Sequence, residues 1–381
     1  MAHRPEDIRN VALVGAGGAG KTTLAESQLN AAKVTSRRGS IPEKNTVSDW
    51  DEDEKERQHS ILATPLHLTW EGQRVNLIDT PGALDFIGEP MCAIAAVETA
   101  VSCVNAHDGV GVSTRRLYKA IQAAGLSCCI VVTRCETENV DGLALLDQIQ
   151  QTVGEKAVPL NLPDAFGAGL TDVVDLFAEN IPDGLPEAAA KYRQQTTDRV
   201  VEVDDALLEK YFESGEVSQE EIEHAFPRAL RAGNIVPVLH VSAEKSVGLR
   251  KLMTFLVHDC PSAGELVTRK AVDAEGNGVK VDPAGPFSAQ VWKIQVDPHV
   301  GKLAYLRVWS GSLASKTQFV NARTGNTERI GDLLEIQGKD MQAVPQAAAG
   351  DLVAVAKIDD VKIGDTMHDG TATWTFVPVL T

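Results

Sequence analysis

The chain has no long hydrophobic run, few aromatic residues and a shortage of basic charge. None of its 381 positions begins a stretch of about 18 uninterrupted apolar residues, which argues against a membrane-spanning helix. The segment from Met1 to Asn10 is polar and lacks the apolar core of a signal peptide, so we expect a cytoplasmic protein. Its 36 lysines and arginines face 53 aspartates and glutamates, a net charge of −17. Non-specific DNA or RNA binding is therefore not expected, although a partner that combines protein and RNA is not excluded.

Cysteine is also scarce, and its spacing excludes two common kinds of site. None of the six cysteines belongs to a Cys-x-x-Cys pair, so neither a zinc site nor a redox motif is predicted. Most of them lie in or beside apolar runs. We therefore expect small buried side chains in a reducing compartment.

What the chain does have is an alternation of strand-like and helix-like segments in its first 265 residues. Apolar, β-branched runs predict strands at 10–14, 74–79, 101–104, 129–133 and 235–241, and helical patterns predict helices at 21–32, 113–124 and 140–153. This order predicts an α/β fold with a doubly wound, mostly parallel sheet. Ligands of such sheets bind at the carboxyl ends of the strands.

The remaining sequence suggests further divisions. Residues 155–233 are first rich in proline and then acidic and amphipathic, which predicts an α+β subdomain inserted into a nucleotide domain spanning 1–265. Residues 266–285 are rich in glycine, proline and charge, as linkers are. Short strands with glycine-containing turns between them predict an antiparallel β-barrel at 286–381.

A glycine-rich motif carries the strongest chemical signal. The segment from Gly15 to Thr22 reads Gly-Ala-Gly-Gly-Ala-Gly-Lys-Thr, the pattern of a phosphate-binding loop between a strand and a helix. Its backbone N–H groups surround phosphates, Lys21 neutralises the β- and γ-phosphates, and the Thr22 hydroxyl ligates Mg²⁺. The predicted nucleotide contacts from this segment are Gly15, Gly17, Gly18, Ala19, Gly20, Lys21, Thr22 and Thr23.

A second motif, Asp79-Thr80-Pro81-Gly82, follows the strand predicted at 74–79. A carboxylate at a strand end beside a phosphate loop is suited to the Mg²⁺ shell, which assigns Asp79 to the metal. Gly82 lets its N–H approach a γ-phosphate without a Cβ in the way. We therefore predict Lys21 and Gly82 as the catalytic groups.

Together the two motifs resemble the translational GTPases, specifically elongation factor G and its bacterial paralogues. The resemblance continues through shorter segments, namely 85–86, 203–211, 235–238, 242–245, 286–289 and 300–303. It implies a P-loop GTPase domain with an inserted subdomain, a β-barrel domain II, GTP or GDP with Mg²⁺, and the ribosome as partner. The family's later domains have no counterpart before Thr381, so we expect a two-domain fragment or a truncated form.

The base-reading segment departs from the family pattern. Where the family has Asn-Lys-x-Asp, this chain has Thr133-Arg134-Cys135-Glu136. Glu136 keeps the charge that reads guanine but is one methylene longer, Arg134 can still stack on the base, and Thr133 loses the amide that braces the phosphate loop. The segment from Ser242 through Ala243 and Glu244 matches the family's second base loop. The similar spacing Asn105-x-x-Asp108 is rejected because it lies one strand too early.

Two further positions concern the switch segments. Residues 45–61 resemble the first switch, with Ser60 at the family's metal-binding threonine; a solvated charged loop is the alternative. Ala83 stands where the family has a histidine that orients the attacking water. A methyl group cannot do this, and His59 and His107 are the nearest possible substitutes.

Three hypotheses follow from these residues. The first is a translational GTPase that acts on the ribosome with Mg²⁺ and hydrolyses GTP slowly because of Ala83. The second is a nucleotide-dependent ribosome-binding or regulatory module with little or no hydrolysis. The third is a P-loop protein with relaxed base choice, which would accept ATP.

Overall fold

The computed structural model describes residues 3–178, 181, 186–265, 270–297, 300–358 and 360–377. The chain forms two units. The first contains residues 1–12, 39–98 and 262–381, and the second contains residues 13–38 and 99–261. The division predicted from the sequence at 265 and 286 stays a prediction.

The second unit is an α/β structure. Its strands are β1 (Ile8–Gly15, shared with the first unit), β4 (Thr99–Asn105), β5 (Ser127–Thr133), β6 (Ala157–Pro159), β7 (Asn161–Pro163), β8 (Val173–Asp175) and β9 (Val236–His240). Its helices are α1 (Lys21–Ala31), α4 (Val112–Ala124), α5 (Gly142–Val153), α6 (Pro186–Val201), α7 (Asp205–Ser214), α8 (Gln219–Ala232) and α9 (Leu249–His258), with a 3₁₀ turn η3 (Gly167–Gly169). The strand order is β1-β4-β5-β9-β6, and β7 pairs with β8.

The parallel sheet predicted from the sequence is confirmed. The pairs β4–β5, β5–β9 and β6–β9 are all parallel. Every residue of β4, β5 and β9 is buried, as expected of strands covered on both faces. Strand β6 was not predicted: it falls inside the segment assigned to the inserted subdomain but pairs with β9 in the main sheet.

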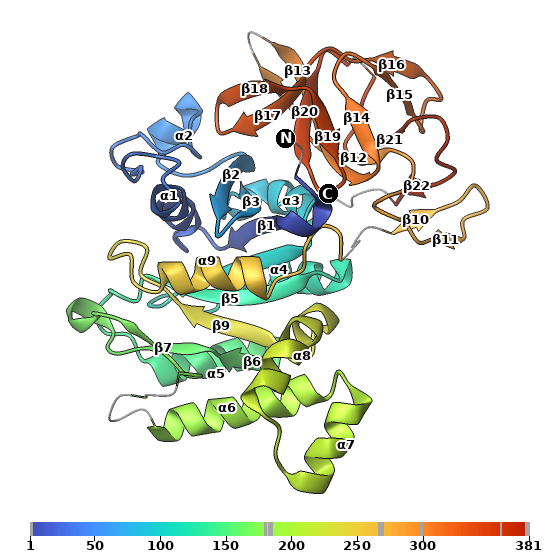
Figure 1. Cartoon of the computed structure of the whole chain (residues 1–381). Coiled ribbons are helices and arrows are strands. Elements are labelled where there is room, and N and C mark those ends of the chain that lie inside the picture. Colours follow the sequence, from blue (N-terminus) through green and yellow to red (C-terminus); the bar gives the residue numbers. More distant parts are fainter. Residues whose placement is uncertain are drawn as a thin grey trace. The chain divides into compact units, whose positions relative to one another are not determined.

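The acidic segment after residue 186 forms three helices, α6, α7 and α8, which follow one another in green and olive in Figure 1. Local capping sets their ends. The Asp204 carboxylate accepts the N–H groups of the first turn of α7, and Ser218 forms a capping box with Glu221 at the start of α8. Gly215 and Gly233 end these helices in the left-handed conformation.

The first unit joins a strand hairpin to an antiparallel sheet. Residues 1–98 of this unit contribute η1 (Pro5–Asp7), α2 (Glu52–Arg57), β2 (Thr64–Trp70), β3 (Gln73–Asp79), η2 (Leu84–Phe86) and α3 (Gly88–Ile94). Later residues contribute β10 (Ala271–Val272), β11 (Gly278–Val279), β12 (Ser288–Asp297), β13 (Gly301–Ser310), β14 (Ser312–Ala314), β15 (Gln318–Asn321), β16 (Thr327–Arg329), β17 (Leu333–Gln337), β18 (Asp340–Val344), β19 (Gln346–Ala348), β20 (Leu352–Ala356), β21 (Thr366–His368) and β22 (Thr375–Phe376).

The antiparallel domain predicted after residue 286 is confirmed. Eight strands, orange to red in Figure 1, are hydrogen-bonded in the order β16-β15-β21-β12-β13-β20-β17-β18, and β14 pairs with β19. Alternate side chains such as Ala289, Val291, Leu306 and Val308 fill its core. The described part of the segment expected to be a linker contains β10 and β11, which form a small sheet with β22. Residues 266–269 of that segment lie outside the described residues.

The hairpin β2–β3 is antiparallel, with Trp70 opposite Gln73 and Thr64 opposite Asp79. It packs in the same unit against the end of β17, where the Gly338 N–H donates to the Pro65 carbonyl oxygen at 3.1 Å. None of the described helices is long and apolar enough to cross a lipid bilayer.

Candidate functional site

The phosphate loop lies in the second unit, between the end of β1 and the start of α1. Gly15 has φ +146°, and a Cβ at this position would lie 2.4 Å from the Cys103 carbonyl oxygen, so only glycine fits. Gly20 adopts the left-handed conformation and caps α1. The side chain of Lys21 is buried, and its Nζ donates to the carbonyl oxygens of Gly15 and Ala16, both at 2.9 Å. The side chain of Lys21, predicted to bind the phosphates, therefore lies against the start of the phosphate loop.

Thr133, at the end of β5, braces this loop. Its Oγ1 donates to the Ala19 carbonyl oxygen at 2.7 Å and lies 3.2 Å from that of Val104. Thr133 lacks the amide of the family's asparagine, as expected from the sequence, but its hydroxyl provides a contact to the phosphate loop. A Cβ built on Gly20 would lie 3.6 Å from Thr133, so the two segments are in close contact.

The residues after Thr133 form a turn with an unusual buried atom. Arg134 adopts a positive φ of 57° and its side chain is exposed. Burial raises the pKa of the Cys135 thiol to about 12, which leaves it an inert packing group. The Oε2 atom of Glu136 is buried and has no hydrogen-bond partner within the described part of the chain. An orphaned buried carboxylate oxygen calls for a donor, and the guanine N1 and N2 groups are donors of this kind.

The loop from Ser242 to Lys245 is attached to α1 and to the segment after it. The Ala243 carbonyl oxygen accepts hydrogen bonds from Ser27 Oγ at 3.1 Å and from Arg38 Nη1 at 2.8 Å. Arg38 also forms an ion pair with Glu244 at 2.8 Å. The second unit thus brings together all three segments that the sequence assigned to the nucleotide. Sequence reasoning missed Ser27 and Arg38, for which no motif gives a signal.

The rejected spacing at Asn105 and Asp108 closes a turn at the end of β4. Asn105 Nδ2 donates to Asp108 Oδ2 at 2.7 Å, and its distance to the Gly18 carbonyl oxygen is 3.4 Å. His107 Nδ1 lies 3.1 Å from Asp108 Oδ1. These contacts explain Asn105 and Asp108 without a role in reading the base.

Asp79 lies in the first unit, at the end of β3, and only 1% of its surface is exposed. The hydroxyl of Ser48 donates to Asp79 Oδ2 at 2.6 Å, and Ser48 is equally buried. Sequence reasoning assigned the metal-side hydroxyl to Ser60 and overlooked Ser48, although both lie in the predicted switch segment. The structure therefore adds a residue to the surroundings of this carboxylate.

The switch segment around Ser60 is ordered by a buried glutamate. Asp51 and Glu54 form a capping box at the start of α2, so residues 52–57 are helical, although most of their side chains are exposed. Glu54 Oε1 also accepts the N–H groups of Ile61 at 2.9 Å and Leu62 at 3.0 Å. Burial raises the pKa of the Glu54 carboxyl, although these hydrogen bonds oppose the effect.

Ala83 begins the turn η2, and its carbonyl oxygen accepts the Phe86 N–H at 3.1 Å. The ring of His59 lies 6.2 Å from the ring of Phe86, measured between centroids. Of the two histidines considered as substitutes, His59 thus lies in the same unit as Ala83 and close to its turn. His107 belongs to the second unit.

The predicted metal ligands are hydroxyl and carboxylate oxygens, the donors that Mg²⁺ prefers. Among the described residues no group of three or more histidine, cysteine, aspartate or glutamate side chains could hold a metal ion. Mg²⁺ usually takes one or two carboxylates and completes its shell with phosphates and water. Asp79 and Ser60 in the first unit, and Thr22 in the second, each offer an oxygen donor of this kind, and their assignment to Mg²⁺ stays a prediction.

Comparisons with known proteins identify two families, one for the α/β region and one for the antiparallel domain that follows it. The family model of the elongation factor Tu GTP binding domain matches residues 6–262, and that of elongation factor G domain 2 matches residues 286–370. The chain is also similar to a protein from Thermus thermophilus whose crystal structure has a TM-score of 0.84 and 32% sequence identity over 96% of this chain. The match spans 54% of that protein, so the present chain corresponds to about half of it.

Proposed function

Because the chain belongs to the translational GTPases, with an elongation factor Tu GTP binding domain followed by elongation factor G domain 2, we propose that it is a Mg²⁺-dependent GTPase that acts on the ribosome and hydrolyses GTP slowly. The observation that carries the proposal is the meeting of three loops in the second unit. Thr133 contacts the phosphate loop, and the loop at Ala243 is attached to α1 through Ser27. A purine nucleotide is the ligand class that needs a phosphate loop and two base loops together.

In this proposal the chain's own groups bind and orient the nucleotide. Lys21 and the loop N–H groups hold the phosphates, and the orphaned oxygen of Glu136 accepts from the base. Mg²⁺, held through Asp79, Thr22 and Ser60, would neutralise charge on the phosphates. Positioning and charge neutralisation supply most of the catalysis in phosphoryl transfer.

Slow hydrolysis follows from Ala83. The methyl group cannot accept a proton from water or donate a hydrogen bond to it. Loss of a positioned acid–base group costs about 10²–10⁴ in rate. The second hypothesis, a regulatory module with little hydrolysis, rests on this same residue, and a measured rate separates the two.

Relaxed base choice is the third hypothesis, and Glu136 is the residue that decides it. Its carboxylate is one methylene longer than the family's aspartate, but no described residue donates a hydrogen bond to its buried Oε2 atom. We therefore expect guanine to remain preferred over adenine, by a smaller margin than in a protein with Asn-Lys-x-Asp.

Equilibrium titration of GDP, GTP and ATP, with Mg²⁺ and with chelator, tests the proposal. Lys21→Ala should weaken triphosphate binding by roughly tenfold to a hundredfold, as expected for a lost charge-assisted hydrogen bond. Lys119→Ala, an exposed lysine on α4, is the matched control and should bind as the native chain does. Equal affinity of the Lys21 variant and the native chain would contradict the assignment, provided both melt at the same temperature.

A further inference from the structure

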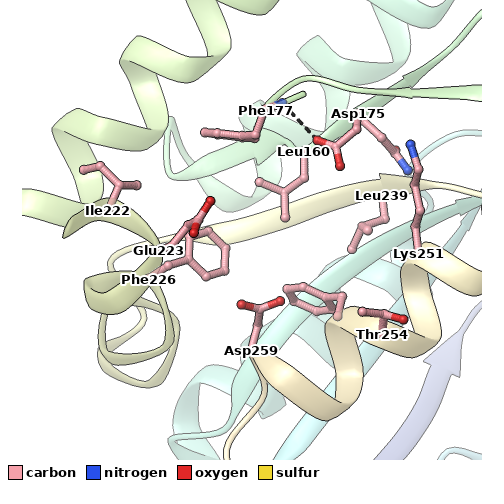
Figure 2. A pocket seen from close by; sticks show the side chains of 12 residues that line it. Leu160, Asp175, Phe177, Ile222, Glu223, Phe226, Leu239, Lys251, Thr254 and Asp259 are labelled. Atoms are coloured by element: carbon pink, nitrogen blue, oxygen red, sulfur yellow. Dashed lines mark hydrogen bonds between the residues drawn. The ribbon is translucent and has the colours of Figure 1, made fainter. Parts of the chain in front are cut away.

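A cavity lies in the second unit, and none of its lining residues is a predicted nucleotide contact. It has a volume of about 280 Å³ and is lined by residues of α8, α9, β7, β8 and β9. Figure 2 shows Phe177, Phe226 and Leu239 among its lining side chains, which come from different elements. The volume lies near the lower end of the range for small-molecule sites, and an apolar wall with a few polar groups is typical of them.

One buried polar group in this cavity lacks a partner. Asn161 is only 2% exposed and lines the cavity. Its Oδ1 accepts the His240 N–H at 2.7 Å, whereas its Nδ2 is buried and has no hydrogen-bond partner among the residues that the structure describes. A buried donor without an acceptor is unfavourable, so a ligand that carries an acceptor would relieve the cost.

The charges around the cavity are mostly negative. Asp175, Glu223 and Asp259 line it together with a single lysine, Lys251. Lys251 Nζ already donates to the Val173 carbonyl oxygen at 2.9 Å. A cation is therefore the complementary ligand charge.

The polar groups gather at two ends. Figure 2 shows Glu223 and Asp259 on one side of the cavity and Asp175 with Lys251 on the other. Asn161 belongs to the second side, because it is the register partner of Asp175 in the β7–β8 hairpin. Burial raises the pKa of Asp259 to about 6; the neighbouring His258 opposes this shift and Glu223 adds to it.

We propose that this cavity binds a small organic cation, a protonated primary amine on a flat apolar body with a hydrogen-bond acceptor at its far end. The ammonium group meets Glu223 and Asp259, the body lies among the phenylalanine and leucine side chains, and the acceptor meets Asn161 Nδ2. The three contacts account for the charge, the apolar wall and the orphaned donor. Nucleotide phosphates are excluded by the same carboxylates.

Tyramine is a suitable probe because it combines an ammonium group, an aromatic ring and a phenolic oxygen. The full chain, labelled at its methyl groups and loaded with GDP, is titrated with tyramine and followed by methyl NMR. We expect shifts at the methyl groups of Leu160, Ile222 and Leu239, which line the cavity. Leu306, in the core of the antiparallel sheet, should not shift.

Two matched ligands separate the contacts. 4-Ethylphenol lacks the ammonium group and should bind about tenfold or more weakly, whereas phenethylamine lacks the oxygen and should lose severalfold. If 4-ethylphenol binds as tightly as tyramine, the cavity recognises the apolar body of the ligand and not its charge, and the proposal fails. It fails also if millimolar tyramine shifts none of the three methyl groups.

Protein variants provide the second line of evidence. Asp259→Asn keeps the shape of the side chain and should weaken tyramine about tenfold. Glu223→Gln, on the exposed face of α8, should act in the same direction and keeps the test valid if the buried variant does not fold. Glu209→Gln, an exposed carboxylate of α7 outside the cavity, is the control. Unchanged tyramine affinity in both Glu223→Gln and a folded Asp259→Asn would overturn the assignment, while GDP binding reports separately on the proposed function.

Discussion

Replacing Thr133 by valine should weaken nucleotide binding and leave the protein folded. The side chain is 2% exposed, and its Oγ1 is 2.7 Å from the Ala19 carbonyl oxygen and 3.2 Å from that of Val104. A hydroxyl has one proton, so it serves one acceptor at a time, and the shorter contact is the better hydrogen bond. Valine has nearly the same shape and creates no cavity. The loss is therefore one neutral hydrogen bond and a partly orphaned carbonyl group, about 1–3 kcal/mol.

We expect the lost hydrogen bond to lower nucleotide affinity, because it holds a carbonyl group of the phosphate loop. Ala19 lies within the phosphate loop, so a carbonyl released by Thr133→Val disturbs the orientation of neighbouring loop N–H groups. Affinity for GDP and GTP should fall equally, by at least severalfold and at most about a hundredfold. Thr133→Asn places an amide donor at the same position and should recover part of the affinity.

Titration with a fluorescent GDP analogue measures the affinity, and urea unfolding measures stability. The control is Thr152→Val on α5, which removes a hydroxyl hydrogen bond to the Gln148 carbonyl oxygen far from the nucleotide loops. If Thr133→Val loses stability but binds GDP as the native chain does, the hydroxyl supports the fold alone, and the brace has no role in binding.

Three other changes are expected to have measurable effects. Glu136→Asp should strengthen GTP binding and leave ATP binding almost unchanged, because aspartate restores the family's reach to the base; parallel titrations check this. Ala83→His should raise single-turnover GTP hydrolysis on ribosomes, by up to about 10²–10⁴, in a protein long enough to engage them; strong stimulation of the native protein with no gain in the variant would show that another residue orients the water. Glu98→Gln should lower the free energy of unfolding by about 3–5 kcal/mol, because it removes the charged partner of the buried Arg307; a change below about 1 kcal/mol in urea unfolding would refute this reasoning.

Much of the fold could be predicted because burial leaves a local pattern. Strands β4 and β5 are mostly apolar in the sequence and are buried along their whole length in the structure. Strand β6 is only three residues long and ends in a proline, so it gives no periodic signal. Its membership of the sheet depends on pairing with β9, which lies more than 70 residues later and cannot be found by local reasoning.

The candidate site also contains parts that the sequence could predict and parts that it could not. The phosphate loop and the Asp79 motif are contiguous, and their chemistry can be derived from residue order alone. The hydroxyl of Ser48 on Asp79 and the hydrogen bonds of Ser27 and Arg38 to Ala243 depend on tertiary approach. Serine and arginine are common surface residues, so nothing in their local sequence marks them as partners.

Arg307 shows what tertiary structure adds to function. In the sequence it is one charge within an apolar strand, but in the structure its Nη2 donates to Glu98 Oε1 at 2.7 Å in a fully buried ion pair. The other oxygen of Glu98 accepts from Asn10 Nδ2 at 2.9 Å, and Asn10 Oδ1 accepts from Asn76 Nδ2 at 2.8 Å.

Asn76 lies in β3, the strand that ends at Asp79, so the network joins β13 of the antiparallel domain to β3. A buried charge is tolerated only when its hydrogen bonds are complete, because each unmet group in a low-dielectric interior is costly. Any shift of β13 relative to β3 would break a member of this chain of contacts. Within the first unit, strand β3 is therefore held in part by Arg307 of β13, more than 200 positions away in the sequence from Glu98 and Asn76.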